Sequence, residues 1–171
     1  RVTAGGAATL DSVDLYAANG GVLSLAGATT FTSRAGGNTI QASEVGSKVD
    51  LSGLTELVGG SSGATQIKAL SGGEVAVSGD VAGRTAWTLD GSGGAFDVSG
   101  VTRLSDAVVN VSGGSVVAFS SATSLARSTL MATNRGQILF PVVTSYVGDD
   151  HAHTTIEANG VGSRIDLSSL A

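Results

Sequence analysis

Both histidines of this chain lie in one short segment, GDDHAH, which also carries two aspartates. His151 and His153 could offer imidazole nitrogens, and Asp149 and Asp150 carboxylate oxygens, to a divalent metal ion. Ligands packed this closely in sequence rarely enclose an ion unaided, and the chain has no second histidine cluster to complete a site. We therefore interpret the segment as a solvated polar loop and expect no metal and no cofactor.

Three aspartates, Asp50, Asp97 and Asp166, recur at one outward position of a repeated strand pattern. Carboxylates held together on an outer face perform acid and base catalysis in many enzymes that act on polysaccharides. Here Ala76 takes the position between the first two, which puts even this nearest pair about 10 Å apart. The column is not a compact acid pair, and we expect the chain not to be an enzyme.

The segment DGSGGAFDVSG, from Asp90 to Gly100, approaches the Gly- and Asp-rich nonapeptide with which some β-helices bind calcium. Phe96 stands where that motif needs a glycine. We interpret Asp90 as a turn residue and Asp97 as an outward-facing strand residue, which leaves no calcium site.

The elements that must position these side chains form an internal repeat. TIQASEVGSKVDLSGL, from Thr39 to Leu54, returns as TIEANGVGSRIDLSSL, from Thr155 to Leu170. Looser copies of the same phrase lie between them, each with an apolar-x-apolar step, a glycine turn and a second apolar-x-apolar step. Alternation of this kind is typical of short strands with one face buried.

The leading residues of these steps define two predicted columns. The first column is Leu15, Ile40, Ile67, Trp87, Val109, Leu130 and Ile156. The second column is Leu23, Val49, Val75, Phe96, Val117, Ile138 and Ile165. Every member is expected to point inward, which places Trp87 in the core.

A third apolar element follows, ending at Phe31, Leu57, Leu104, Leu125 and Tyr146, with a threonine two residues before each end. The third coil departs from this pattern at Asp80-Val81. An ordered threonine array could bind ice, but Glu56 and Arg103 would interrupt a flat face, so corner threonines that satisfy backbone groups are the favoured interpretation.

Each unit of 21 to 27 residues contains three predicted strands, and no strand can bury its apolar face alone. This pattern predicts an all-β fold, namely a single-stranded parallel β-helix of about seven coils. Right-handed crossovers of parallel strands make the coil right-handed. We expect one segment spanning 1–171, with a partial coil or cap over 1–14 and seven coils over 15–171, the last truncated. The chain lacks an initiator Met and the pattern stops at Ala171, so we expect a piece of a longer repeat protein.

Coil length varies at one edge of this predicted rod. Longer connections follow Phe31, Leu57 and Tyr146, and they carry Arg34, Ser61 and the group Asp149, Asp150, His151 and His153. Loops on a rigid scaffold often bind ligands, so these six residues are the candidate binding residues. Tolerated variation in loop length is the alternative.

Composition excludes several classes of protein. The chain has 171 residues, a net charge of −5, 42% hydrophobic and 13% charged residues, 26 glycines and no cysteine. Low charge with high hydrophobicity opposes intrinsic disorder, and the glycine content opposes long helices. The acidic balance opposes binding to nucleic acid, and no apolar run is long enough for insertion in a membrane.

The phrases NTIQASEVGSKVDLSGLTEL and TTIEANGVGSRIDLSSL resemble the repeat arrays of large bacterial surface and secreted proteins of the parallel β-helix, adhesin-like type. This resemblance implies an extracellular or cell-surface location and a structural or adhesive role as a stiff scaffold or spacer. It implies glycans, other surface proteins and neighbouring repeats of the same chain as partners. The alternative is a carbohydrate-binding or polysaccharide-degrading β-helix, with the long loops shaping a groove.

Overall fold

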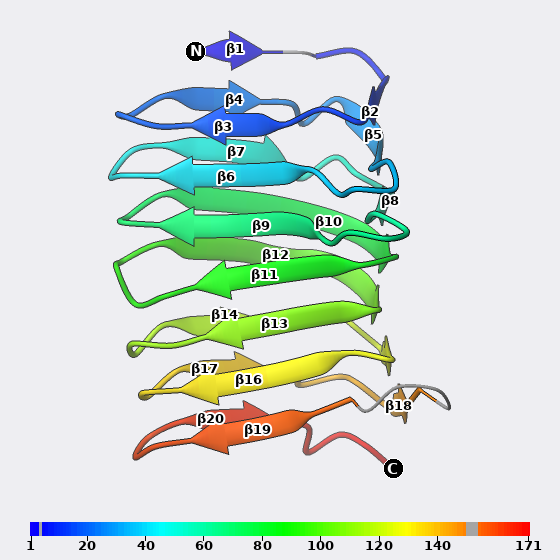
Figure 1. Cartoon of the computed structure of the whole chain (residues 1–171), viewed down its shortest axis with the longest axis vertical. Helices are drawn as coiled ribbons and strands as arrows, with labels where there is room; N and C mark the ends of the chain where they lie inside the picture. Colours follow the sequence, from blue (N-terminus) through cyan, green and yellow to red (C-terminus); the bar gives the residue numbers. More distant parts are fainter. Residues whose placement is uncertain (4, 150–153) are drawn as a thin grey trace.

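The computed structural model describes residues 1–3, 5–149 and 154–171. In these ranges every regular element is a β-strand, and the strands pair in parallel. They wind into a rod of stacked coils with the N-terminus at one end and the C-terminus at the other (Figure 1). The predicted all-β, parallel β-helix fold is confirmed.

One flat sheet of seven strands forms the first face of the rod. Its strands are β3 (Leu15–Ala17), β6 (Thr39–Ser43), β9 (Thr65–Leu70), β11 (Thr85–Leu89), β13 (Ala107–Val111), β16 (Thr129–Thr133) and β19 (Ile156–Asn159). All seven leading residues of the first predicted column pair in sequence along this sheet, from Leu15 with Ile40 to Leu130 with Ile156. This pairing confirms the predicted register. The register is strongly specified, since a slip of one residue would turn every apolar side chain outward.

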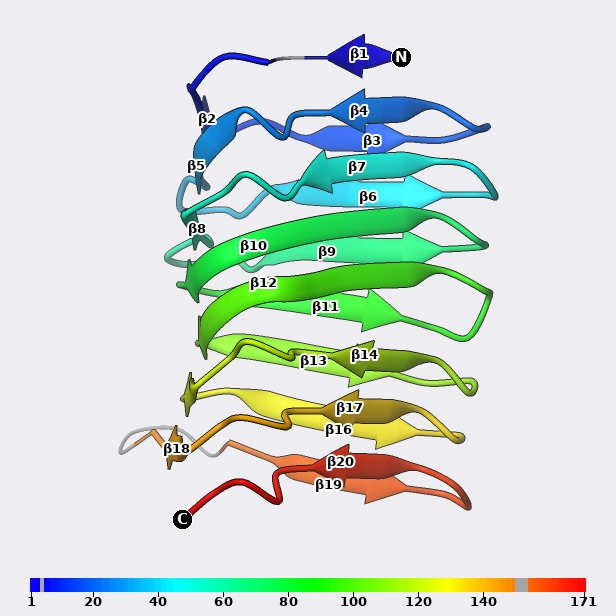
Figure 2. The same ribbon diagram turned by 180° about the vertical axis from the view of Figure 1, so that it is seen from behind.

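The second face lies behind the first and is seen in front in Figure 2. Its strands are β1 (Val2–Thr3), β4 (Val22–Ser24), β7 (Lys48–Leu51), the first parts of β10 (Glu74–Ala82) and β12 (Ala95–Ser105), and then β14 (Val116–Ala118), β17 (Gln137–Leu139) and β20 (Arg164–Asp166). Val75 pairs with Val49 on one side and with Phe96 on the other, as the repeat predicts. The last three strands form a separate small sheet.

The third face closes each coil. It is built from β2 (Ala8–Asp11), β5 (Ala28–Thr32), β8 (Glu56–Val58), the second parts of β10 and β12, β15 (Ser124–Ala126) and β18 (Ser145–Val147). In the third and fourth coils the second and third strands merge into one long bent strand, with register shifts near Gly79. Val81 nevertheless pairs with Leu57 and Leu104, so the shortened third coil keeps its place in the stack.

The winding is right-handed. In Figure 1 the first-face strands run towards the left in front, the second-face strands return towards the right behind, and the chain descends from N- to C-terminus. At the N-terminal end, β1 pairs with β4 and β2 pairs with β5, so residues before Leu15 supply the second and third strands of one further coil.

A corner of glycines and serines joins the first face to the second. Gly46 and Gly162 occupy the same place in the two clearest repeat copies, and both have φ of 81°, which glycine adopts without strain. The next residues, Ser47 and Ser163, accept hydrogen bonds at 3.0 Å from the backbone N–H groups of Gly20 and Arg135 in the coil above. The Gly-Ser pair thus turns the chain and satisfies a donor of the neighbouring turn.

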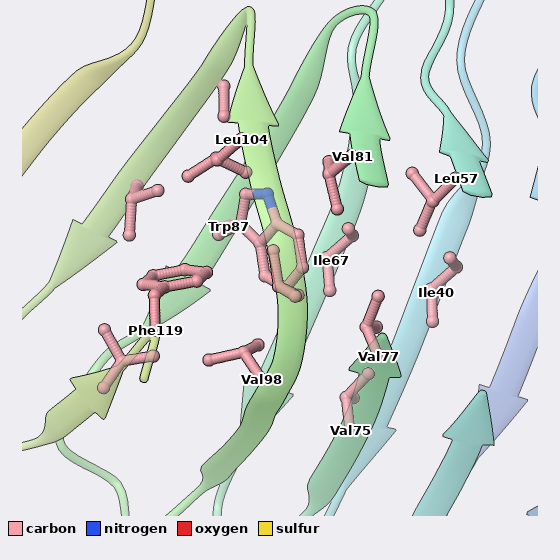
Figure 3. Packing of buried hydrophobic residues seen from close by; sticks show 14 of the residues in the cluster. Ile40, Leu57, Ile67, Val75, Val77, Val81, Trp87, Val98, Leu104 and Phe119 are labelled. Carbon is pink, nitrogen blue, oxygen red and sulfur yellow. The ribbon is translucent and has the colours of Figure 1, made fainter. Parts of the chain in front are cut away.

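Apolar side chains from the three faces fill the interior in continuous columns (Figure 3). Ile40, Ile67, Val49, Val75 and Ile138 are completely buried. Each such side chain contributes about 1.5 to 3 kcal/mol of transfer free energy. Burial in stacked columns is therefore the main stabilising contribution in this weakly charged chain.

The middle coils carry the aromatic part of the core. Trp87 is completely buried and its ring meets Phe96 edge-on, with centroids 5.5 Å apart. Phe119 also meets Trp87 edge-on, and it stacks on Phe140 at 4.7 Å. The prediction that Trp87 lies in the core is confirmed.

The corner threonines hydrogen-bond to backbone. Thr55 Oγ1 donates to the carbonyl oxygen of Thr29 at 3.0 Å, and Thr144 Oγ1 donates to that of Thr123 at 3.3 Å. Thr102 instead donates to the carboxylate of Asp80. These bonds connect neighbouring coils, and for Thr55 and Thr144 they agree with the predicted role of satisfying backbone groups at a corner.

Two buried threonines in adjacent strands make a matched pair for substitution. Thr85 Oγ1 accepts a hydrogen bond of 2.9 Å from Trp87 Nε1, whereas Thr65 Oγ1 has no hydrogen-bond partner in the described part of the chain. Thr65→Val should raise the free energy of unfolding by about 1 kcal/mol, and Thr85→Val should lower it by about 1 to 3 kcal/mol because the indole N–H would lose its acceptor. Urea unfolding of the two variants measures this, and shifts of the same sign would contradict it.

Candidate functional site

The candidate binding residues lie on one edge of the rod, where the third face returns to the first. Arg34 lies in the connection after β5, Ser61 in the connection after β8, and Asp149 follows β18. The first two connections are neighbours, but the third is four coils further along, about 19 Å away. Asp150, His151 and His153 lie outside the described residues. Among the described candidates, Arg34 and Ser61 share one end of the edge and Asp149 occupies the other.

The connections that carry Arg34 and Ser61 pack on each other through backbone. The N–H groups of Ser62 and Gly63 donate to the carbonyl oxygen of Ala35 at 2.9 and 2.6 Å. A Cβ atom added to Gly63 would lie 2.2 Å from the carbonyl oxygen of Gly36. These glycines permit close layering of two loops, and this layering leaves no open space between them at that point.

Arg34 itself points into solvent. Its guanidinium lies 3.9 Å from the carboxylate of Asp11, and both side chains are more than half exposed. An exposed pair of this kind contributes little to stability. Ser61 is also exposed. Both side chains are accessible to a partner, and their role in binding stays a prediction.

Asp149 lies near an ion pair that the sequence analysis missed. Arg127 donates two hydrogen bonds of 2.7 Å to the carboxylate of Asp106 in the preceding coil. Hydrogen bonding to Asp106 raises the pKa of Arg127, and the charges of Asp106 and Asp149 raise it further. The sequence contains one indication of this ion pair. Asp106 and Arg127 are 21 residues apart, which is the length of one short coil and places them at equivalent positions in neighbouring coils. Along this edge, Asp149 acts as a counter-charge to a guanidinium.

The aspartates of the second face each accept hydrogen bonds from the serine two residues later. Ala76 pairs with Asp50 on one side and Asp97 on the other, as predicted. Asp50 Oδ1 accepts from the Oγ of Ser52, and Asp97 Oδ1 accepts from the Oγ of Ser99, each at 2.7 Å. This Asp-x-Ser arrangement is an Asx turn.

Asp166 repeats that arrangement with Ser168. Hydrogen bonds from the Ser168 side chain and backbone lower the pKa of Asp166. A general acid in glycoside hydrolysis needs a carboxyl pKa that is raised. The hydrogen bonds at Asp166 lower its pKa instead. The arrangement of the three aspartates therefore favours a role in holding local turns over a role in catalysis.

A hollow lies at the glycine corner near the C-terminal end, where the sequence predicted only a turn. It has a volume of about 460 Å³ and is lined by Gly113, Gly114, Asn134, Arg135, Gly160 and Val161. Asn134 and Arg135 have φ of 49° and 70°. Both residues adopt the left-handed backbone conformation in this turn. The lining offers one cation and one amide but no aromatic ring.

A second, smaller groove of about 320 Å³ runs over the third face. Its charged lining residues are Glu56, Asp80 and Arg103, and Arg103 Nε lies 4.0 Å from Asp80 Oδ2. The single guanidinium therefore faces two carboxylates. This groove has a mixed polar surface without a concentrated charge.

The described ranges, 1–3, 5–149 and 154–171, lack two features. They contain no group of three His, Cys, Asp or Glu side chains that could hold a metal ion. Those same ranges also contain no helix long and apolar enough to span a bilayer.

Comparison of the chain with protein-family models, curated proteins and solved structures finds no match.

Proposed function

We propose that this chain is a stiff structural or adhesive module of a large extracellular or cell-surface protein, as its resemblance to bacterial adhesin-like repeat arrays implies. The observation that carries the proposal is the stack of buried apolar columns, which Figure 3 shows for the middle coils and which becomes exposed at the C-terminal end, where Ile156 is 45% exposed. Strand pairing is continuous along the first and third faces, and on the second face it is divided only between β12 and β14, so two of the three faces hold every coil to the next.

The positions of the termini support a spacer role. The described chain begins at one end of the rod and finishes at the other (Figure 1). The eight strands of the second face, from β1 to β20, are separated by seven spacings of about 4.8 Å, which gives about 34 Å of length between those ends. A module of this form separates what is joined to its two ends by a fixed distance.

The competing proposal is a carbohydrate-binding or polysaccharide-degrading β-helix. It would use the hollow at the glycine corner or the groove on the third face, because both are open enough for a short glycan. The Asx turns of Asp50, Asp97 and Asp166 give this proposal no acid and base that act together.

A polysaccharide cleavage assay and a glycan array separate the two proposals. The structural module is expected to show no turnover of acidic or neutral polysaccharides, and an Asp50→Asn/Asp97→Asn variant should behave like the unchanged chain. Asp90→Asn provides a matched control, because Asp90 accepts a hydrogen bond from Ser92 in the same Asp-x-Ser arrangement and lines neither the hollow nor the groove. Turnover that disappears in the double variant and persists in the control would overturn the structural proposal.

A further inference from the structure

The first face presents one central outward ladder of side chains. Its members pair in register along the sheet: Tyr16, Gln41, Lys68, Thr88, Asn110, Met131 and Glu157. Only Lys68, in the third strand, and Glu157, in the seventh, are charged. In Figure 1 the seven strands lie side by side along the rod, and no other segment crosses in front of them.

These two charges have no ion-pair partner within the described residues. Lys68 lies between Gln41 and Thr88 in the neighbouring strands. Glu157 lies beside Met131 and accepts a hydrogen bond of 3.1 Å from Asn159 Nδ2. The face therefore carries one cation and one anion four strands apart on a sheet of otherwise neutral side chains in that ladder.

We propose that this face binds a second copy of the chain in an antiparallel arrangement, with the two-fold axis lying along β13. Rotation about that axis superimposes the third strand on the seventh, the fourth on the sixth and β13 on itself. Lys68 of each copy then faces Glu157 of the other, so one interface forms two equivalent ion pairs. A closed two-fold contact of this kind is the commonest symmetry of protein dimers.

The same axis brings like apolar surface together. Val108 in β13 is 38% exposed and is one of the large apolar residues on the surface. It faces its own copy across the axis, and Thr88 faces Met131. The parallel alternative, with both rods pointing the same way, would place Lys68 against Lys68 and Glu157 against Glu157. Repulsion between like charges therefore selects the antiparallel pair.

The overlap sets the strength of the contact. Five strands of each copy overlap with five of the other. The overlapping surface on each copy measures about 24 Å across the strands and about 16 Å along them. About 800 Å² in total is then buried, which is in the range of weak and transient complexes. The dimer should form at high protein concentration and dissociate as salt screens the two ion pairs.

Sedimentation velocity with charge reversals tests this arrangement. The unchanged chain should show a sedimentation coefficient that rises with concentration towards about 1 mM and falls on addition of salt. K68E and E157K should each remain monomeric, since each places like charges together twice. The K68E/E157K double variant, and an equimolar mixture of the two single variants, should recover the dimer.

Arg135→Glu is the matched control for K68E, because it makes the same change in net charge at the glycine corner and away from the first face. It should dimerise like the unchanged chain. Neither K68E nor E157K meets a like charge in the neighbouring strands of its own chain, so circular dichroism should show unchanged folding. A chain that stays monomeric throughout, or a double variant that does not recover the dimer, would overturn the proposal.

Discussion

Ile138→Asp is expected to abolish the cooperative thermal unfolding of this chain. Ile138 is completely buried in β17, paired with Val117 in the coil above and with Ile165 in the coil below. A carboxylate at this position would lose its hydration and gain no partner from the apolar column. An uncompensated buried charge costs about 4 kcal/mol or more, a large part of the stability of an ordinary domain.

Gln137→Asp is the control for that variant. Gln137 precedes Ile138, points outward and pairs with Arg164 in the next coil. An aspartate there stays hydrated and lies near a guanidinium, so the free energy of unfolding should change by no more than about 0.5 kcal/mol. Thermal melts followed by circular dichroism compare the two variants. Equal midpoints would show that Ile138 does not point inward.

Gly53→Ala should cause the second largest loss, although it adds only one methyl group. A Cβ atom at Gly53 would lie 1.8 Å from the carbonyl oxygen of Ala26 and 3.2 Å from that of Ala28. Both atoms belong to backbone and cannot rotate away. The first and second coils would be forced apart beside the bond from Thr55 N–H to the Thr29 carbonyl. We expect a loss of about 3 kcal/mol.

Gly36→Ala provides a contrast on the same side of the first coils. A Cβ atom at Gly36 meets nothing within 4 Å, and its φ is not positive. This substitution should leave stability unchanged or raise it by about 0.4 to 1 kcal/mol, because it restricts the unfolded chain. Urea titration of both variants gives the two free energies. A Gly53→Ala protein as stable as Gly36→Ala would contradict the close approach of the coils.

Gly53 also shows what a repeat pattern does not reveal. The equivalent positions in the fifth and sixth coils are Ser121 and Val142, which carry Cβ atoms and are exposed. The sequence alone would therefore predict that Gly53 can be replaced. Its requirement arises from the path of the Ala26–Ala28 backbone, which approaches the second coil closely at that position.

The candidate sites were predicted less completely than the fold. Sequence analysis placed Arg34, Ser61 and Asp149 on one edge, and the structure locates them there. It did not identify the hollow beside Arg135, because the space arises from missing side chains in three stacked turns. Nor did it pair Asp106 with Arg127, since side-chain contact between coils depends on rotamers that a spacing does not determine.

The sequence by itself determined the winding of this protein. Apolar side chains at every second residue, repeated every 21 to 27 residues, permit one register in which the columns are buried, and any slip exposes them. Only the tertiary structure decided the merging of strands in β10 and β12 and the layering of the two N-terminal loops. These features depend on the distances between the backbones of neighbouring coils. The register does not determine those distances, because they result from local packing and hydrogen bonding.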